Sequence, residues 1–181
     1  GVASVGASAT TLSPAGLGGA ALHMFTHGTI TGLLFLMVGL IYERVHTRHI
    51  PDLGGLSTQM PILATVFVVG GLASLGLPST SGFASEVLVL MGTFSIGTWG
   101  IPIVIAAAFG VVLTAGYILW MLQRTLFGPK LPRFDGAVDA VAVDILPMAL
   151  LLAAIFVIGI YPALLTDVFN MGLAPILGGV S

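Results

Sequence analysis

The sequence predicts an all-α fold, a polytopic transmembrane helix bundle in which one helix is discontinuous. Three observations predict it. The 181-residue chain is 57% hydrophobic and only 7% charged, whereas soluble domains carry about 25% charged residues. Several apolar stretches are long enough to cross a bilayer. The five basic residues fall in two polar segments, which restricts how often the chain crosses the membrane between them.

Composition also excludes several classes of protein. The net charge is −2, so the chain lacks the basic field that nucleic-acid binding requires, and we expect no nucleic-acid partner. Cysteine is absent from the sequence, which excludes disulfides, thiol catalysis and thiolate-held zinc or iron–sulfur sites. A phosphate-binding loop, a nucleophile elbow and a dinucleotide fingerprint are absent too. We therefore expect no catalytic, cofactor-binding or metal-binding residues in this chain.

The first third of the sequence begins with a short apolar segment, residues 1–9, which would form only ~14 Å of helix. We expect it to be the tail of a truncated transmembrane helix, so that the sequence is a C-terminal fragment of a longer protein. A turn at 11–14 precedes the first full transmembrane helix, expected at 15–42. Residues 43–58 are polar, and their positive charge assigns this loop to the cytoplasm. Its two histidines, His46 and His49, indicate a solvated or subunit-docking face.

Region 60–98 is about twice as long as one crossing and is interrupted at 76–82 by the residues GLPSTSG. Both basic segments, 43–58 and 124–142, are expected in the cytoplasm, so two crossings must separate them. The apolar stretch 101–123 supplies one crossing, which leaves one for region 60–98. We therefore predict a discontinuous helix broken at membrane depth, a feature that transporters use at ion sites. The alternative is an ordinary hairpin turn at the opposite membrane face.

The last third of the sequence contains one further crossing. After the cytoplasmic loop at 124–142, an apolar transmembrane helix is expected at 143–162, where Pro162 ends it. Residues 163–181 are apolar, Gly-rich and uncharged apart from Asp167. We expect them to form a C-terminal tail.

Glu86 is the acidic residue that lies far from every polar loop, four residues beyond Gly82 at the helix break. A carboxylate at the centre of a membrane helix costs about 2.5–3.5 kcal/mol, a cost that is seldom retained without a use or a partner. We interpret Glu86 as a proton-transfer residue. The alternative is a cap or an ion pair that locks the broken helix.

His27 lies near the middle of the first transmembrane helix, and His23 lies one turn earlier on the same face. A metal site is disfavoured because no further His, Cys or nearby acid in this segment completes it. An imidazole has an ordinary pKa near 6.5 and can both accept and donate a proton, so His27 is interpreted as a second proton-transfer residue. For His23 the sequence favours hydrogen-bonded packing.

Hydroxyl groups on neighbouring helices could line a hydrated route between these groups. The candidates for channel lining are Thr31, Ser74, Thr114 and Tyr117, although Thr and Ser in membrane helices more often bond their own backbone. Gly28 and Gly32 form a GxxxG motif, which predicts tight helix packing.

Several segments together resemble the antiporter-like proton-channel subunits of respiratory complex I, of the subunit M or mitochondrial chain 4 type. The matching segments are His27-Gly28 followed by LLFL, YERVHTRHI (42–50), GGL (54–56), Met60-Pro61, LASLGLPSTSGFASE (72–86) and YILWMLQRTLFG (117–128). They cover roughly residues 20–130. Ser79 and Ser85 stand where the family often has glycine, and His23 matches no family histidine.

The resemblance implies that the helices belong to the second of two inverted five-helix repeats, plus a final helix. It implies that Glu86 is the glutamate of the broken helix and faces the exit half-channel, and that His27 is the mid-helix histidine of a polar axis. The implied partners are the other membrane-arm subunits, the lipid bilayer, protons and channel water. NADH, FMN, iron–sulfur clusters and quinone are expected in partner subunits, with no cofactor in this chain.

The function that the resemblance implies is the exit-side half of a proton channel in an H⁺-translocating NADH:quinone oxidoreductase. The chain is then an enzyme only as a subunit of that translocase, because quinone is reduced elsewhere in the complex. We expect it in a bacterial inner membrane or an energy-transducing organelle membrane. One alternative is a subunit of a multisubunit cation/proton antiporter or a membrane-bound hydrogenase. An alternative of another class is a structural assembly subunit without a proton site.

Overall fold

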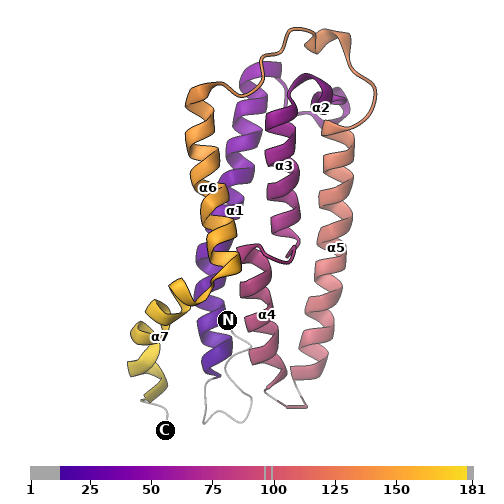
Figure 1. The fold of residues 1–181 in the computed structure, drawn as a ribbon. Helices are drawn as coiled ribbons and strands as arrows, with labels where there is room; N and C mark the ends of the chain where they lie inside the picture. The colour runs from indigo at the N-terminus through magenta and orange to yellow at the C-terminus, as the bar shows by residue number, and fades with distance from the viewer. Residues whose placement is uncertain (1–12, 96, 99, 179–181) are drawn as a thin grey trace.

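The computed structural model describes residues 13–178 except residues 96 and 99, and all regular structure in that part of the chain is helical (Figure 1). The helices are α1 (Pro14–Val45), α2 (Leu56–Gln59), α3 (Pro61–Ser74), α4 (Ser81–Phe94), α5 (Gly100–Leu126), α6 (Ala142–Ile160) and α7 (Ala163–Gly178), with 3₁₀ turns at Ile50–Asp52 and Pro132–Phe134. Three of them, α1, α5 and α6, are long and apolar enough to cross a membrane. The predicted all-α class is confirmed. The helix tail expected at 1–9 lies outside the described residues.

The first helix, α1, is longer than the sequence predicted because both of its ends are capped. At its start the Ser13 hydroxyl accepts a hydrogen bond from the Gly16 backbone N–H at 3.2 Å, and Pro14 occupies the first helical position. At its end His46 adopts a left-handed conformation and donates its backbone N–H to the Tyr42 carbonyl at 2.8 Å. The 32 residues span about 48 Å, which exceeds the ~30 Å hydrocarbon core of a bilayer.

Helices α3 and α4 form the predicted discontinuous helix. In Figure 1, α4 continues along the bundle where α3 ends, and the two together run beside α1 and α5. The chain turns between them at Gly76, whose φ of 72° lies in the left-handed region that glycine adopts without strain. The Thr80 hydroxyl donates to the Leu77 carbonyl at 2.6 Å, which gives a partner to a carbonyl within the break. The alternative of a hairpin turn is therefore wrong.

The main hydrophobic core joins α1, α3, α5 and α6. Its most deeply buried side chains include Leu33, Met37, Leu63, Leu122 and Ile155. These residues lie on α1, α3, α5 and α6, so the core holds the half of the discontinuous helix that precedes the break. In a soluble protein, burial of such a core would be the main stabilising term, at about 25 cal/mol per Å² of apolar surface removed from water. In a bilayer, close van der Waals contact takes over that role.

Small residues set the closest helix contacts, although not at the predicted motif. A side chain at Gly82 of α4 would meet the Ala73 carbonyl oxygen at 2.5 Å, so the break can close only around a glycine. In contrast, a side chain at Gly28 or Gly32 would meet no atom of the described residues within 4 Å. The expectation that this GxxxG motif packs tightly is therefore wrong for the described part of the chain, because these two positions face away from its other helices.

Both charged segments, 43–58 and 124–142, lie together at one end of the bundle, at the top of Figure 1. The second segment also caps the discontinuous helix. The Asp139 carboxylate accepts the backbone N–H of Ile62 at 2.8 Å and that of Leu63 at 3.1 Å, which satisfies two free donors at the start of α3. A carboxylate at this position also interacts favourably with the helix dipole. The two loops thus share one end, as the two-crossing prediction requires.

The C-terminal segment differs from the expected tail. Residues 163–178 form α7, which packs against α1 and begins directly after the turn at Pro162. Pro175 lies inside this helix. Glycine and proline are more frequent in membrane helices than in soluble ones. In an apolar environment the backbone N–H groups have few partners other than the chain's own carbonyls, which favours a helix. A Gly-rich apolar composition therefore does not exclude a helix here.

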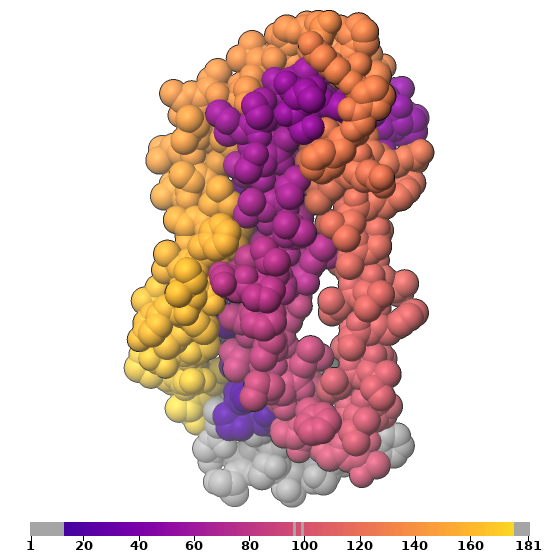
Figure 2. Space-filling model, turned by 45° about the vertical axis from the view of Figure 1, so that its right-hand side comes forward, coloured from indigo at the N-terminus to yellow at the C-terminus, as the bar shows by residue number. Residues whose placement is uncertain are grey.

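The outer surface of α5 is apolar. Exposed side chains include Ile105, Phe109, Val112, Leu113 and Trp120. Figure 2 shows α5 as a column beside α4, with a hollow between them near the middle of the molecule. An apolar surface of this extent fits lipid or other membrane subunits. Together with the three spanning helices, it identifies a multi-pass membrane protein.

Candidate functional site

A cavity of about 360 Å³ opens among α1, α3, α4 and α5 at the level of the helix break. Its lining includes residues of all four helices, and it contains every residue that the sequence singled out for proton transfer or channel lining: Glu86, His27, Thr31, Ser74, Thr114 and Tyr117. These residues are distant in the sequence and are brought together by helix packing. The structure thus arranges the candidate residues around one common space.

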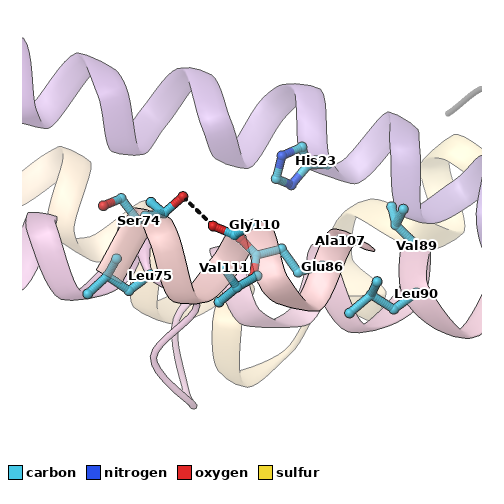
Figure 3. Close-up of a pocket in the computed structure, with 10 residues that line it drawn as sticks. His23, Ser74, Leu75, Glu86, Val89, Leu90, Ala107, Gly110 and Val111 are labelled. Atoms are coloured by element: carbon cyan, nitrogen blue, oxygen red, sulfur yellow. Dashed lines mark hydrogen bonds between the residues drawn. The ribbon is translucent and has the colours of Figure 1, made fainter. Parts of the chain in front are cut away.

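A second cavity, of about 300 Å³, adjoins the first (Figure 3). Both are lined by His23, Ser74, Glu86 and Thr114. Beyond these shared residues, the second cavity continues along α4 and α5 toward the end of the bundle opposite the charged loops, and its lining there is apolar, with Val89, Leu90 and Ala107. The two cavities together form a hollow that passes the helix break.

Glu86 lies on the second turn of α4 and reaches back toward the break. Its carboxyl oxygen Oε2 lies so close to Gly76 that a Cβ at that position would be only 2.6 Å away. The absence of a side chain at Gly76 therefore makes room for the carboxyl group. Within residues 13–178, with residues 96 and 99 set aside, Glu86 makes no hydrogen bond and no ion pair. It also does not cap α4, whose N-cap residue is Thr80.

The two histidines of α1 take different positions. His27 is exposed along α1 and lines only the first cavity. His23 is half-buried and lines both cavities. The centroids of their rings are 5.9 Å apart, a separation that one water molecule can bridge with hydrogen bonds. The polar lining therefore includes two imidazoles where the sequence analysis assigned a proton-transfer role to one.

Two buried hydroxyls connect α1 to α4 beside the cavities. Ser85 Oγ lies 3.0 Å from His23 Nδ1 and 3.0 Å from Thr26 Oγ1, and both Ser85 and Thr26 are fully buried. Sequence reasoning did not predict this network. Ser85 carries no signal beyond its position next to Glu86, because the partner of a helix hydroxyl depends on how the two helices are rotated.

The hydroxyls that were expected to line a channel are hydrogen-bonded to their own helices. Thr31 donates to the His27 carbonyl at 2.6 Å, Ser74 to the Gly71 carbonyl at 2.6 Å, and Thr114 to the Gly110 carbonyl at 3.0 Å (Figure 3). Such bonds use the hydroxyl proton, as the sequence analysis anticipated. The oxygen of each hydroxyl can still accept a hydrogen bond from within the cavity.

Among the described residues, no group of three or more His, Asp or Glu side chains is placed to hold a metal ion. His23 and His27 are a pair, and a zinc site needs at least three protein ligands. Imidazole and carboxyl groups, which both line the first cavity, are suited to bind and release protons.

Comparison with known proteins defines the family. Residues 1–114 match the family model described as "NADH:quinone oxidoreductase/Mrp antiporter, TM". The chain belongs to this family. NADH-quinone oxidoreductase subunit M of Rhodobacter capsulatus is 40% identical over 160 residues, which are 88% of this chain and 31% of that protein. A second member, NAD(P)H-quinone oxidoreductase chain 4 2 of Synechococcus sp. (strain JA-2-3B'a(2-13)), is 38% identical over 166 residues. The chain spans about a third of the length of these curated relatives.

A solved structure of the family shares the fold. The chain is similar to a chain of respiratory complex I from Thermus thermophilus with bound NADH, with a TM-score of 0.82 and 28% sequence identity. The match covers 93% of this chain and 34% of that one. The resemblance found in the sequence is therefore confirmed at the level of family and fold.

Proposed function

We propose that this chain is part of a proton-translocating membrane subunit of an NADH:quinone oxidoreductase and carries the exit-side half of its proton channel. Relatives named subunit M and chain 4 and the similar fold within a complex I structure support this assignment. The observation that carries it is Glu86. This membrane carboxyl group has no partner among the described residues and faces a cavity that His27 also lines.

In the proposed path, His27 supplies protons to the first cavity and Glu86 passes them on into the second. The combined hollow is far larger than the ~10–15 Å³ that one water molecule needs, and polar groups on all four surrounding helices offer hydrogen bonds. A carboxylate without a fixed cation can take up a proton and release it, whereas an ion pair would hold it ionised. Ser74, Thr114, Thr31 and Tyr117 supply oxygen atoms that water in the cavity can bond.

The orientation follows from the charged end of the bundle. All five basic residues lie in or beside the two segments at that end, so we propose that it faces the cytoplasm and that the second cavity leads toward the opposite side. Single cysteines at Thr47 and Pro132, in a cysteine-free background, should both be labelled from the cytoplasmic side. Labelling from opposite sides would contradict both the orientation and the single crossing by α3 and α4.

The other components of the reaction are proposed to lie in partner subunits. NADH, FMN, iron–sulfur clusters and quinone would be bound there, and this chain would contribute proton movement within a bacterial inner membrane or an energy-transducing organelle membrane. Neighbouring membrane-arm subunits and lipid are the proposed partners of the apolar outer faces.

A subunit of a cation/proton antiporter is the second candidate function, because the family description itself includes Mrp antiporters. Neighbouring genes separate the two: genes for NADH- and quinone-binding subunits favour the oxidoreductase, and an antiporter operon favours the second candidate. A membrane-bound hydrogenase would be identified by hydrogenase genes in the same neighbourhood.

Substitution of Glu86 tests the proposed function against a purely structural role. In the full-length subunit within its assembled complex, Glu86→Gln keeps the shape of the side chain but removes the titratable proton. We expect normal subunit content, with coupled NADH:quinone activity and proton pumping reduced together by about tenfold or more, the scale of a lost acid–base group. Glu86→Asp should retain part of both. Parental pumping in the assembled Gln variant would show that Glu86 is structural.

A further inference from the structure

His23 occupies the junction of the two cavities. Its ring lines both of them together with Glu86, whereas His27 lines only the first. Figure 3 shows the imidazole directed from α1 into the second cavity, on the side where Glu86 enters from α4. With Ser74, Glu86 and Thr114, His23 therefore borders the place where a proton would move from the first cavity into the second. A purely packing role, which the sequence favoured, accounts for a hydrogen bond to α4 but not for this position.

The hydrogen bonds around Ser85 indicate which ring nitrogen of His23 is free. The Ser85 hydroxyl donates to the Gly82 carbonyl at 2.9 Å, and a carbonyl can only accept. Because the hydroxyl has a single proton, its oxygen then accepts a bond from His23 Nδ1–H at 3.0 Å. In the neutral ring this leaves Nε2 unprotonated and able to take up a proton. Ser85 thus holds the orientation of the ring, and donation of its proton to Gly82 selects the Nδ1–H tautomer of His23.

The charged and titratable groups that face this position are few. On α1 the group is His27, on α4 it is Glu86 and on α5 it is Tyr117, while α3 contributes the uncharged Ser74. The lining contains no Lys or Arg side chain. Glu86 is therefore the carboxyl group in the lining of both cavities that can accept a proton released by His23.

We propose that His23 is a proton-transfer residue between His27 and Glu86, and that Ser85 is its positioning residue. This inference deepens the proposed function and rests on it. A proton from the first cavity binds Nε2 and converts the ring to imidazolium. The same nitrogen then releases a proton through the second cavity to a Glu86 carboxylate oxygen, and the ring returns to its neutral Nδ1–H form. The net result is one proton moved, with no other bond made or broken.

The test compares variants of the full-length subunit in the assembled complex. His23→Gln keeps an amide that can bond Ser85 but cannot titrate. We expect parental subunit content, proton pumping per assembled complex reduced about tenfold, and a changed pH profile of coupled activity between pH ~5 and ~8, where imidazoles titrate.

Ser85→Ala keeps the imidazole but removes its hydrogen bond to Ser85, so this variant should pump partially, with a shifted pH profile. Met24→Leu, next to His23 but on the exposed face of α1, is the control and should behave like the parent.

The outcomes separate this inference from the proposed function. If His23→Gln pumps at the parental rate with an unchanged pH profile while Glu86→Gln does not pump, His23 is a packing residue and the proposed function stands. If Glu86→Gln also pumps normally, the proposed function itself fails. If His23→Gln does not assemble, Ser85→Ala decides: a shifted pH profile supports the proposal, and an unchanged one overturns it.

Discussion

Two acidic residues of this chain, Asp144 and Glu86, lie in opposite environments. The Asp144 carboxylate, near the charged end of the bundle, pairs with the Arg44 guanidinium and accepts the Val141 backbone N–H at 3.0 Å. Both side chains of the pair are largely buried, with 13% and 10% of the Arg44 and Asp144 side chains exposed. Glu86 has no such partners among the described residues and faces two cavities. A buried acid that is fully paired holds structure, and one left unpaired beside a cavity is available to bind a proton.

The largest expected effect comes from breaking the Asp144 pair. Arg44→Ala would leave a buried carboxylate unpaired and would also remove the bonds from Arg44 to the Val138 and Leu40 carbonyls. We expect a loss of about 3–5 kcal/mol in stability, measured as reduced subunit content and a lower temperature of thermal inactivation. Arg133→Ala is the matched control. Its ion pair with Asp52 is long, at 4.0 Å, and exposed, so its loss should cost less than about 1 kcal/mol.

Although Arg44→Ala should be less stable, the complexes that do assemble should pump at the parental rate, because the Arg44–Asp144 pair lies outside the cavities. Equal stability of Arg44→Ala and Arg133→Ala would contradict the structural role of the pair.

A smaller effect is expected from crowding the unpaired acid. Gly76→Ala would introduce a Cβ 2.6 Å from Glu86 Oε2 at a backbone position with φ of 72°. Backbone strain of this kind costs about 1–3 kcal/mol, and the carboxyl group must move. We therefore expect modest destabilisation together with slower pumping. Gly32→Ala, where a side chain meets no described atom within 4 Å, is the matched control within a helix. If the two alanine variants pump at the same rate, the close contact between Gly76 and Glu86 does not affect proton pumping.

The smallest effect concerns a third acid, Asp135, which is paired but exposed. Its hydrogen bond with the Lys130 ammonium, at 2.6 Å, lowers the pKa of the Asp135 carboxyl below its ordinary value of 3.8. Because the folded-state pKa is lowered, the pair stabilises the protein above pH ~4, and that contribution is lost as the pH falls through the lowered pKa. Asp135→Asn should therefore be slightly less stable than the parent at neutral pH and equal to it in strong acid. Thermal inactivation at several pH values would show this, and a difference that grows on acidification would contradict it.

The distribution of charge in the sequence was enough to predict the discontinuous helix. Positive residues must stay on one side of a membrane, so the number of crossings between the segments 43–58 and 124–142 had to be even. Glu86 could be singled out for a related reason, because an acid far from every loop has to be accommodated within the bundle. These inferences use only the cost of placing charge in lipid, which depends little on the details of packing.

Contacts that depend on the rotation of helices could not be predicted. Arg44 and Asp144 are 100 residues apart in the sequence, and nothing in the local pattern around either residue identifies its partner. The bond between His23 and Ser85 has the same origin. The helical conformation of residues 163–178 was missed because glycine and proline lower helix propensity in water, whereas an apolar environment favours internally bonded backbone.

The central claim is that Glu86 transfers protons whereas Asp144 holds structure, and proton pumping per assembled complex in Glu86→Gln and Asp144→Asn tests it most directly. Both variants replace an acid by its amide, so they change charge in the same way. Glu86→Gln should assemble fully and lose pumping by about tenfold or more. Asp144→Asn should assemble less well, and the complexes that do assemble should pump at the parental rate. Two results would contradict the account: parental pumping in Glu86→Gln, or reduced pumping in the assembled complexes of Asp144→Asn.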